Sequence, residues 1–280
     1  MEIVEINEEN LDEFVDYIDE DVAESIGRKY YRGMGIIDDS EDILGSLIWE
    51  YKNSNDDDDT LAELVWLSLE QGAESDELFE AFKEDAEFEN VKKSFFELEN
   101  PDEVVAEALT AQSFKTKKRE SRDIYTTVGE LAGLSIARKK PPSYIVGLFD
   151  LTVKQYRQGI ITCLYKGRKG LVEDLAVMPM GWYDMDVSCA VRTDGEITGF
   201  LLVHRYPSGI LAPVFLFASG PNSKMDLLNM LRYAIRSAAE EFSPETSVLI
   251  RRHNPAVKAL SDKLFPGVKG DTVLYGERKE

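Results

Sequence analysis

Two halves of the chain carry the same pattern of apolar and turn residues, and this internal repeat constrains the fold more than any single motif does. The segment YIVGLFDLTVKQYRQGI, which begins at Tyr144, aligns with EIVEINEENLDEFVDYI, which begins at Glu2. ITGFLL aligns with ILGSLI, and LAPVFLFAS, which begins at Leu211, aligns with LAELVWLSL, which begins at Leu61. RHNPAVKAL aligns with LENPDEVVA, so that an Asn-Pro pair closes the series in each half. Chance does not readily place so many matched blocks in one order, so we expect two copies of one α/β unit.

The stretch from residue 210 to residue 235 shows the pattern of a strand, a turn and a helix. Leu211 to Phe217 is a short, almost continuously apolar run, which is typical of a strand buried on both faces. Gly220 and Pro221 then interrupt it, and apolar residues recur at helical spacing from Met225 onward. The first N–H groups of a helix have no internal partner, so an anion can bind at this turn. The alternative is that the turn only caps a core helix.

The net charge of −21 is unevenly distributed. Residues 1–114 carry 35 acids against 7 bases, whereas residues 115–280 carry 18 acids against 25 bases. The excess of acids argues against nucleic acid or an anionic membrane as a partner. It also suggests that a cationic partner could bind the acidic half.

The sequence offers few residues for metals, disulfides or membrane insertion. No apolar run is long enough to span a bilayer, and the N-terminus MEIVEINEEN is acidic where a signal peptide is basic and then apolar. Cys163 and Cys189 lie far apart, and His204 and His253 are the only histidines. We therefore expect a cytoplasmic protein without a zinc site or a disulfide.

The segment ARKKPPS predicts a boundary between the two halves, because paired prolines exclude both helix and sheet. On this basis residues 1–130 form the first domain, residues 131–142 a linker and residues 143–280 the second domain. A last hairpin around Lys269 to Tyr275 is predicted to complete the second domain.

The order of predicted elements in each half resembles the GNAT acetyltransferase family, and the resemblance covers nearly the whole chain twice. It implies an α/β (α+β) fold with two tandem GNAT-like domains, each a mixed, mostly antiparallel twisted sheet flanked by helices. In that family the fourth and fifth strands splay apart, acyl-CoA lies between them, and its pyrophosphate rests on the turn that starts the intervening helix. Pro213 suits such a splay because it lacks the N–H of a ladder bond. Asn254 and Leu260 match the family's Asn and Leu after the fifth strand.

The predicted phosphate turns depart from the family pattern of Gln or Arg, two residues, Gly, one residue, and Gly or Ala. The second half has SGPNSK, which keeps one glycine, two hydroxyls and Lys224, whereas the first half has EQGAESDE. A pyrophosphate near the latter would be repelled by roughly 1 kcal/mol per nearby exposed acid. The resemblance therefore implies acetyl-CoA as co-substrate in the second half only. The residues that it implies for binding are Phe215, Phe217, Ser219, Gly220, Asn222, Ser223, Lys224 and Asn254.

The residues that move protons in the family are not all matched here. The family's Tyr, an acid toward the departing thiolate, is replaced by Ser261, and a hydroxyl far from its own pKa is a poor acid. The family's base on the fourth strand would fall near Glu63 in the first half and near Pro213 in the second. Further candidates are His253, after the fifth strand, and the aspartates in GWYDMDV, Asp184 and Asp186.

The resemblance implies an N-acetyltransferase that moves the acetyl group of acetyl-CoA to a primary amine of a small molecule or peptide. Positioning of amine and thioester, with backbone N–H groups polarising the carbonyl, would supply most of the catalysis. The alternative is a non-catalytic GNAT-fold protein that binds CoA or another anionic ligand, with the acidic first half as a structural or interaction partner.

Overall fold

The computed structural model describes residues 1–53, 59–73, 75–167, 177–252 and 255–280. The chain divides into two compact units. The first contains residues 1–121 and 271–280, and the second contains residues 122–270.

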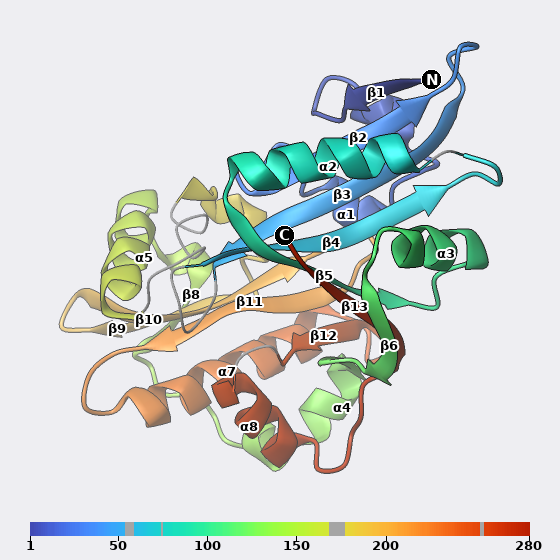
Figure 1. Cartoon of the computed structure of the whole chain (residues 1–280). Helices are drawn as coiled ribbons and strands as arrows, with labels where there is room; N and C mark the ends of the chain where they lie inside the picture. The colour runs from blue at the N-terminus through green and yellow to red at the C-terminus, as the bar shows by residue number, and fades with distance from the viewer. Residues whose placement is uncertain (54–58, 74, 168–176, 253–254) are drawn as a thin grey trace. The chain divides into compact units, whose positions relative to one another are not determined.

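The first unit is built on a mixed sheet which, among the described residues, has seven strands in the order β1-β2-β3-β4-β5-β13-β6 (Figure 1). These strands are β1 (Glu2–Glu5), β2 (Tyr31–Ile37), β3 (Ile43–Asn53), β4 (Thr60–Leu69), β5 (Val91–Glu99), β6 (Lys115–Glu120) and β13 (Thr272–Lys279). β4 and β5 are parallel, and their other neighbours are antiparallel. The helices are η1 (Leu11–Phe14), α1 (Glu20–Ala23), α2 (Asp76–Phe88) and α3 (Glu103–Ala111). α2 buries Leu78, Phe79 and Phe82 in a core that includes Trp49 and Phe96, while Phe14 and Ile18 lie in a separate cluster with Ile48.

The second unit has a mixed sheet in the order β7-β12-β11-β10-β9-β8 (Figure 1). Its strands are β7 (Asp123–Thr127), β8 (Ile145–Gly147), β9 (Cys189–Thr193), β10 (Glu196–Arg205), β11 (Leu211–Ala218) and β12 (Ser247–Arg251). Its helices include α4 (Val128–Gly133), η2 (Ser135–Arg138), η3 (Leu148–Asp150), α5 (Val153–Gly167), η4 (Met180–Trp182), α7 (Ser223–Glu241) and α8 (Pro255–Leu264). β11 and β12 are parallel.

Successive side chains of β10 pack into two hydrophobic cores, one on each face of this second sheet. Leu201 and Val203 pack in the cluster that contains Met230 of α7, and Phe200 and Leu202 pack in the cluster that contains Tyr156 of α5. We name these the α7 face and the α5 face. Together the two sheets confirm the predicted fold class, since each half is a mixed, mostly antiparallel sheet flanked by helices.

Two glycines occupy matching positions in the two sheets. A Cβ built on Gly45 of β3 would lie 2.4 Å from the carbonyl oxygen of Ser68, and one on Gly199 of β10 would lie 2.7 Å from that of Phe217. Each of those carbonyls belongs to the antiparallel strand that follows the glycine's own strand. The glycine is therefore required at the same place in each copy, because the next strand approaches too closely for a side chain.

The pairing of strands shifts one part of the sequence alignment by one residue. Gly45 lies opposite Leu69 and Gly199 lies opposite Ala218. Leu69 and Ala218 are therefore equivalent positions. Counting back from them along β4 and β11 makes Leu211 equivalent to Ala62, whereas the sequence alignment predicts Leu61. The sequence alignment followed identical Leu-Ala letters, whereas the register is set by hydrogen bonding to the preceding strand.

The domain boundaries differ from the predicted ones, because the halves exchange strands. β13, from the end of the chain, lies between β5 and β6 of the first unit and pairs with both. β7 pairs with β12 of the second unit. The predicted terminal hairpin of the second domain is therefore a central strand of the first unit. Such long-range pairing leaves no trace in local periodicity.

The predicted linker at residues 131–142 contains helical structure. α4 begins at a capping box, in which the Thr127 hydroxyl accepts the N–H of Glu130 and the Glu130 carboxylate accepts the N–H of Thr127. η2 follows, and the paired prolines Pro141 and Pro142 come only after it. The prolines end this helical stretch but do not separate the two units.

Candidate functional site

β11 and β12 part immediately after they meet. Leu211 and Val248 form their one recorded register pair among the described residues, although β11 continues to Ala218. In the first unit, β4 and β5 stay paired from Thr60 to Leu64. Beyond Leu211 the backbone of β11 faces β12 without a ladder, and such a strand edge can pair with an extended polar ligand.

Pro213 lies where the sequence predicted an irregular strand. Leu202 of β10 faces Phe215 and Val203 faces Pro213, so that Val214 is an extra residue in a β-bulge. Pro213 lacks an N–H to donate, which makes this position unsuited to a regular ladder. The bulge redirects the rest of β11, including Phe215 and Phe217, which remain partly buried on the α5 face.

The turn between β11 and α7 lies at the open end of β11. Gly220 adopts φ +104°, which side chains strongly disfavour, and its carbonyl accepts the N–H of Ser223 at 3.3 Å. Asn222 is the N-cap residue of α7, but its side chain makes no capping hydrogen bond. The side chain of Lys224 is exposed in the first turn. The start of this 19-residue helix therefore combines a positive dipole end with a lysine.

Ser219 is held by the neighbouring strand. Its backbone N–H and its hydroxyl both donate to the carbonyl of Thr198, at 2.8 and 3.1 Å. Ser219 thus ties the turn to β10. Asn222, Ser223 and Lys224 are the predicted residues whose polar side-chain groups remain at the turn.

The acid in the first turn of α7 is buried and bound. Asp226 accepts a hydrogen bond from the Tyr144 hydroxyl at 3.0 Å, and the Asn229 side chain donates to that hydroxyl at 2.9 Å. Arg232 in turn donates to Asn229 at 2.5 Å. Burial and the hydrogen bond to Asp226 raise the pKa of Tyr144. This network anchors α7 and keeps the Asp226 carboxylate in the protein interior, where it is not exposed to an anion at the turn.

The matching turn of the first unit is acidic. Gly72 has φ +91°, and α2 begins with Asp76 and Glu77. Glu70 precedes the turn and accepts a hydrogen bond from the Tyr17 hydroxyl at 3.3 Å. Glu74 lies outside the described residues. An anion at this helix start would meet like charges within the first turn, which offset the helix dipole.

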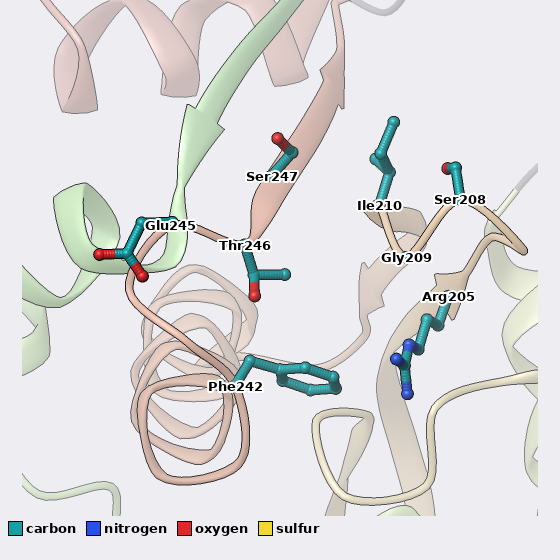
Figure 2. A pocket seen from close by; sticks show the side chains of 8 residues that line it. All are labelled: Arg205, Ser208, Gly209, Ile210, Phe242, Glu245, Thr246 and Ser247. Atoms are coloured by element: carbon teal, nitrogen blue, oxygen red, sulfur yellow. The ribbon is translucent and has the colours of Figure 1, made fainter.

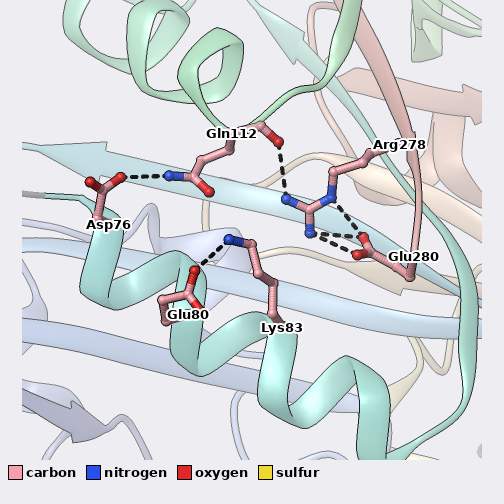
Figure 3. A network of polar contacts seen from close by, with 6 residues as sticks. All are labelled: Asp76, Glu80, Lys83, Gln112, Arg278 and Glu280. Carbon is pink, nitrogen blue, oxygen red and sulfur yellow. Dashed lines mark hydrogen bonds and ion pairs between the residues drawn. The ribbon is translucent and has the colours of Figure 1, made fainter.

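A network of polar contacts also occupies the start of α2 (Figure 3). The Gln112 side chain, at the end of α3, donates to Asp76 at 2.7 Å. Arg278 of β13 donates to the carbonyl of Gln112 at 3.1 Å and pairs with Glu280 at 2.8 Å. The N-terminal end of α2 is therefore already linked to α3 and to the exchanged strand.

His204 is a residue that the sequence analysis did not select. It lies on β10 opposite Ala212, and its side chain is only 2% exposed. Its Nδ1 lies 2.7 Å from the carbonyl oxygen of Trp182, and its ring stacks on that indole with centroids 3.8 Å apart. Because a carbonyl oxygen only accepts, Nδ1 is the donor in this hydrogen bond. The sequence did hold one signal for this residue. His204 follows Phe200 and Leu202 at every second position of an apolar strand, so a polar side chain could be expected on a buried face.

The other predicted proton-transfer residues have structural partners or lie outside the described residues. Asp184 accepts the backbone N–H groups of Asp186 and Val187, at 3.2 and 2.9 Å, and Asp186 itself is exposed. Ser261 is buried in α8 and donates its hydroxyl proton to the Lys258 carbonyl at 3.1 Å. His253 and Asn254 fall among the residues that the structure does not describe, so their predicted roles stay predictions.

Glu63 of the first unit is part of an ion-paired cluster. It pairs with Lys52, which also lies 3.0 Å from Glu50. Burial opposes the charge of Lys52, but the two carboxylates outweigh it and raise the lysine pKa. Glu50 of β3 occupies the position that His204 occupies in β10, counted from the matching glycines. The first unit therefore has an ion-paired carboxylate where the second unit has an imidazole.

A pocket of about 350 Å³ lies elsewhere in the second unit (Figure 2). Its lining comes from the end of β10, the β10–β11 hairpin and the loop before β12. The Arg205 guanidinium packs 5.3 Å from the centre of the Phe242 ring on one side of it. The pocket lies next to Ile210, just before β11 begins and pairs with β12. It does not adjoin the turn that starts α7.

None of the helices in the described part of the chain combines the length and the apolar composition of a membrane span. The same part of the chain holds no group of three His, Cys, Asp or Glu side chains placed to bind a metal ion.

Neither a protein-family model nor a curated protein sequence matches this chain. Solved structures do match it, over the whole length. A tandem GNAT protein from the clavulanic acid biosynthesis pathway aligns over 99% of this chain and 98% of its own, with a TM-score of 0.60 and 11% identity. A putative acetyltransferase from Pyrococcus horikoshii aligns over 100% and 89%, with a TM-score of 0.53 and 11% identity. A GCN5-related N-acetyltransferase from Kribbella flavida aligns over 99% and 70%, with a TM-score of 0.51 and 12% identity. The sequence resemblance is thereby confirmed at the level of fold, and this chain has the GNAT acetyltransferase fold twice in tandem.

Proposed function

We propose that the second unit binds acetyl-CoA and transfers its acetyl group to a primary amine of a small molecule or peptide. The observation that carries this proposal is that β11 and β12 share one register pair in the part of the chain that the structure describes, beside a helix start that presents Lys224. When bound, acetyl-CoA supplies a thioester as the acyl donor. The residues at this site suit such a group, because the part of β11 without a ladder to β12 can pair with amide groups and the helix start can bind phosphates.

Each part of the site has a distinct task in this proposal. Ser223 and Lys224 hold the pyrophosphate at the start of α7, and Asp226 stays bound to Tyr144 in the interior. Backbone N–H groups of β11 near the bulge at Val214 orient and polarise the thioester carbonyl. Phe215 and Phe217 limit the access of water from the α5 face.

The proton of the attacking amine needs an acceptor on the α5 face. We assign this role to His204, which lies on the strand adjacent to β11 and whose Nδ1 donates to the Trp182 carbonyl. A neutral imidazole accepts a proton from an ammonium near neutral pH. The departing thiolate takes its proton from water, since Ser261 is bound within its own helix.

The first test is CoA binding by the full chain, measured by isothermal titration calorimetry. Lys224→Glu should weaken CoA binding about tenfold, because it places a negative charge at the phosphate site. Arg236→Glu, which makes the same charge change farther along the exposed face of α7, serves as the matched control and should leave binding unchanged. Equal affinities for the Lys224→Glu chain and the parent chain would contradict the assigned turn.

A second test separates an enzyme from a binding protein. Acetyl-CoA is incubated with a panel of primary amines, and release of the CoA thiol is followed. Amine-dependent thiol release supports the transferase. CoA binding without release favours the alternative, a GNAT-fold protein that binds CoA or another anionic ligand without turnover.

A further inference from the structure

One helix of the second unit exposes apolar and basic side chains together. On α5, Val153 is 56% exposed, Ile161 47% and Tyr165 89%, and exposed Arg157 stands between them at the same spacing of four residues. Side chains four residues apart lie on one side of a helix. These four residues form what we call the α5 stripe.

The α5 stripe is positively charged in a strongly negative chain. Exposed Lys154 and Lys166 flank it, and no acidic residue lies between Thr152 and Lys166. Exposed aromatic and arginine side chains are enriched in protein interfaces. The net charge of −21 disfavours an anionic membrane as the partner, and the basic stripe therefore fits an acidic protein surface.

The first unit of the same chain presents a helix with the complementary chemistry. α2 exposes Asp76, Glu80, Glu84 and Phe88 at spacings of four residues, together with Glu87. Phe88, at the end of the helix, is 80% exposed. We call these five residues the α2 stripe. Glu80 pairs with Lys83 at 2.5 Å, whereas Glu84 and Glu87 have no recorded ion-pair partner among the described residues.

The two helices also match in length. α5 has 15 residues and α2 has 13, which correspond to about 22 and about 20 Å. Every copy of the chain carries one basic and one acidic stripe. The α5 stripe of one copy can therefore meet the α2 stripe of a second copy.

We propose that the α5 stripe of one copy packs against the α2 stripe of a second copy, and that the protein dimerises through this contact. The apolar side chains Ile161, Tyr165 and Phe88 supply buried area, and the charges set the pairing. This inference does not depend on acyltransferase activity.

The proposal is tested by sedimentation velocity of the full chain over a wide range of protein and salt concentrations. We expect a concentration-dependent dimer that weakens as salt screens the charges. Lys154→Glu with Arg157→Glu should raise the dimer dissociation constant about tenfold or more. Arg236→Glu with Lys258→Glu, which reverses two exposed bases on α7 and α8, is the matched control and should leave it unchanged.

A charge exchange gives the decisive measurement. A chain with Glu80→Lys and Glu84→Lys on α2 should be monomeric by itself, as should the α5 double variant. Mixed together, these two variants should form a heterodimer, since opposite charges then face each other whichever helix each copy contributes. Circular dichroism confirms that each variant is folded.

Several outcomes would overturn the proposal. The parent chain could stay monomeric throughout, its dimer could be indifferent to the α5 reversals, or the mixed variants could fail to associate. Binding of the parent chain to anionic vesicles that is lost with the same α5 reversals would instead assign the stripe to a membrane surface.

Discussion

His204 lies between two aromatic rings, stacked on Trp182 and edge-on to Tyr206, whose centroid is 4.8 Å away. Replacing it with glutamine keeps a polar side chain of similar length but removes the proton acceptor. If His204 is the base, His204→Gln should lower kcat by about a hundredfold while the affinity for acetyl-CoA stays unchanged.

The measurement is kcat together with the dissociation constant of acetyl-CoA for the parent chain and the variant, with Tyr206→Phe as a control that alters the same cluster without removing the imidazole. A loss of CoA affinity equal to the loss of rate, or an unchanged kcat, would assign His204 a structural role only.

Glu277 on β13 is the residue with the most directly testable link between charge and stability. Its carboxylate accepts hydrogen bonds from Lys93 at 2.8 Å and from Tyr275 at 2.7 Å, and these contacts lower its pKa to about 2. A carboxyl whose folded pKa lies below its usual 4.5 stabilises the fold above that value, and this stability is lost as pH falls from 4.5 toward 2. Water screens the pair, because the Glu277 side chain is 45% exposed.

Glu277→Gln should therefore lower the free energy of unfolding by only about 0.5 kcal/mol at neutral pH. The difference from the parent chain should shrink as pH falls through that range. Urea unfolding at a series of pH values measures it, with Glu84→Gln on the exposed face of α2 as the control. A difference that is constant with pH would show that the charge of Glu277 is not involved.

At the scale of elements, the matched glycines Gly45 and Gly199 define how close two neighbouring strands come in each sheet. Alanine at either position would push a Cβ to within 2.4 or 2.7 Å of a backbone carbonyl oxygen, and backbone cannot move aside cheaply. We expect Gly45→Ala and Gly199→Ala each to destabilise the fold by about 1–3 kcal/mol.

Thermal unfolding measures both variants. Gly133→Ala in α4, where nothing lies within 4 Å of the added atom, is the control and should be neutral or slightly stabilising. Equal behaviour of all three variants would contradict the close strand approach.

Strands and long helices were the elements that local patterns predicted best. The apolar run from Leu211 and the helical spacing after Met225 correspond to β11 and α7. The register of β11 was predicted one residue out, because a sequence alignment compares letters while a register depends on which carbonyl meets which N–H across the sheet. The parting of β11 from β12 was expected from the family resemblance and from Pro213.

At the scale of the whole molecule, the exchanged strands make each unit depend on residues from the other half of the sequence. β13 pairs with β5 and β6 at the same time, so it is an interior strand of the first sheet. Removing residues 271–280 should expose both neighbours and unfold the first unit, while the second unit, which does not contain them, keeps its hydrogen-exchange protection.

Hydrogen exchange followed by mass spectrometry distinguishes the two units by peptide. Lys279→Ala, a change at the last residue of the same strand, should leave protection in place. Persistent protection of β5 and β6 in the truncated chain would show that β13 is dispensable to the first sheet.

By itself the sequence determined that the chain is a duplicated α/β unit and that its second copy has the helix start better suited to an anion. Apolar periodicity, glycines and charges are local properties, and each can be read without knowing which segments meet. Only the tertiary structure decided which strands exchange between halves, that His204 stacks on Trp182, and that Ser219 and Ser261 are bound to backbone carbonyls. These features are contacts between segments distant in sequence. Their stability depends on distances and angles between those segments, which local sequence patterns do not contain.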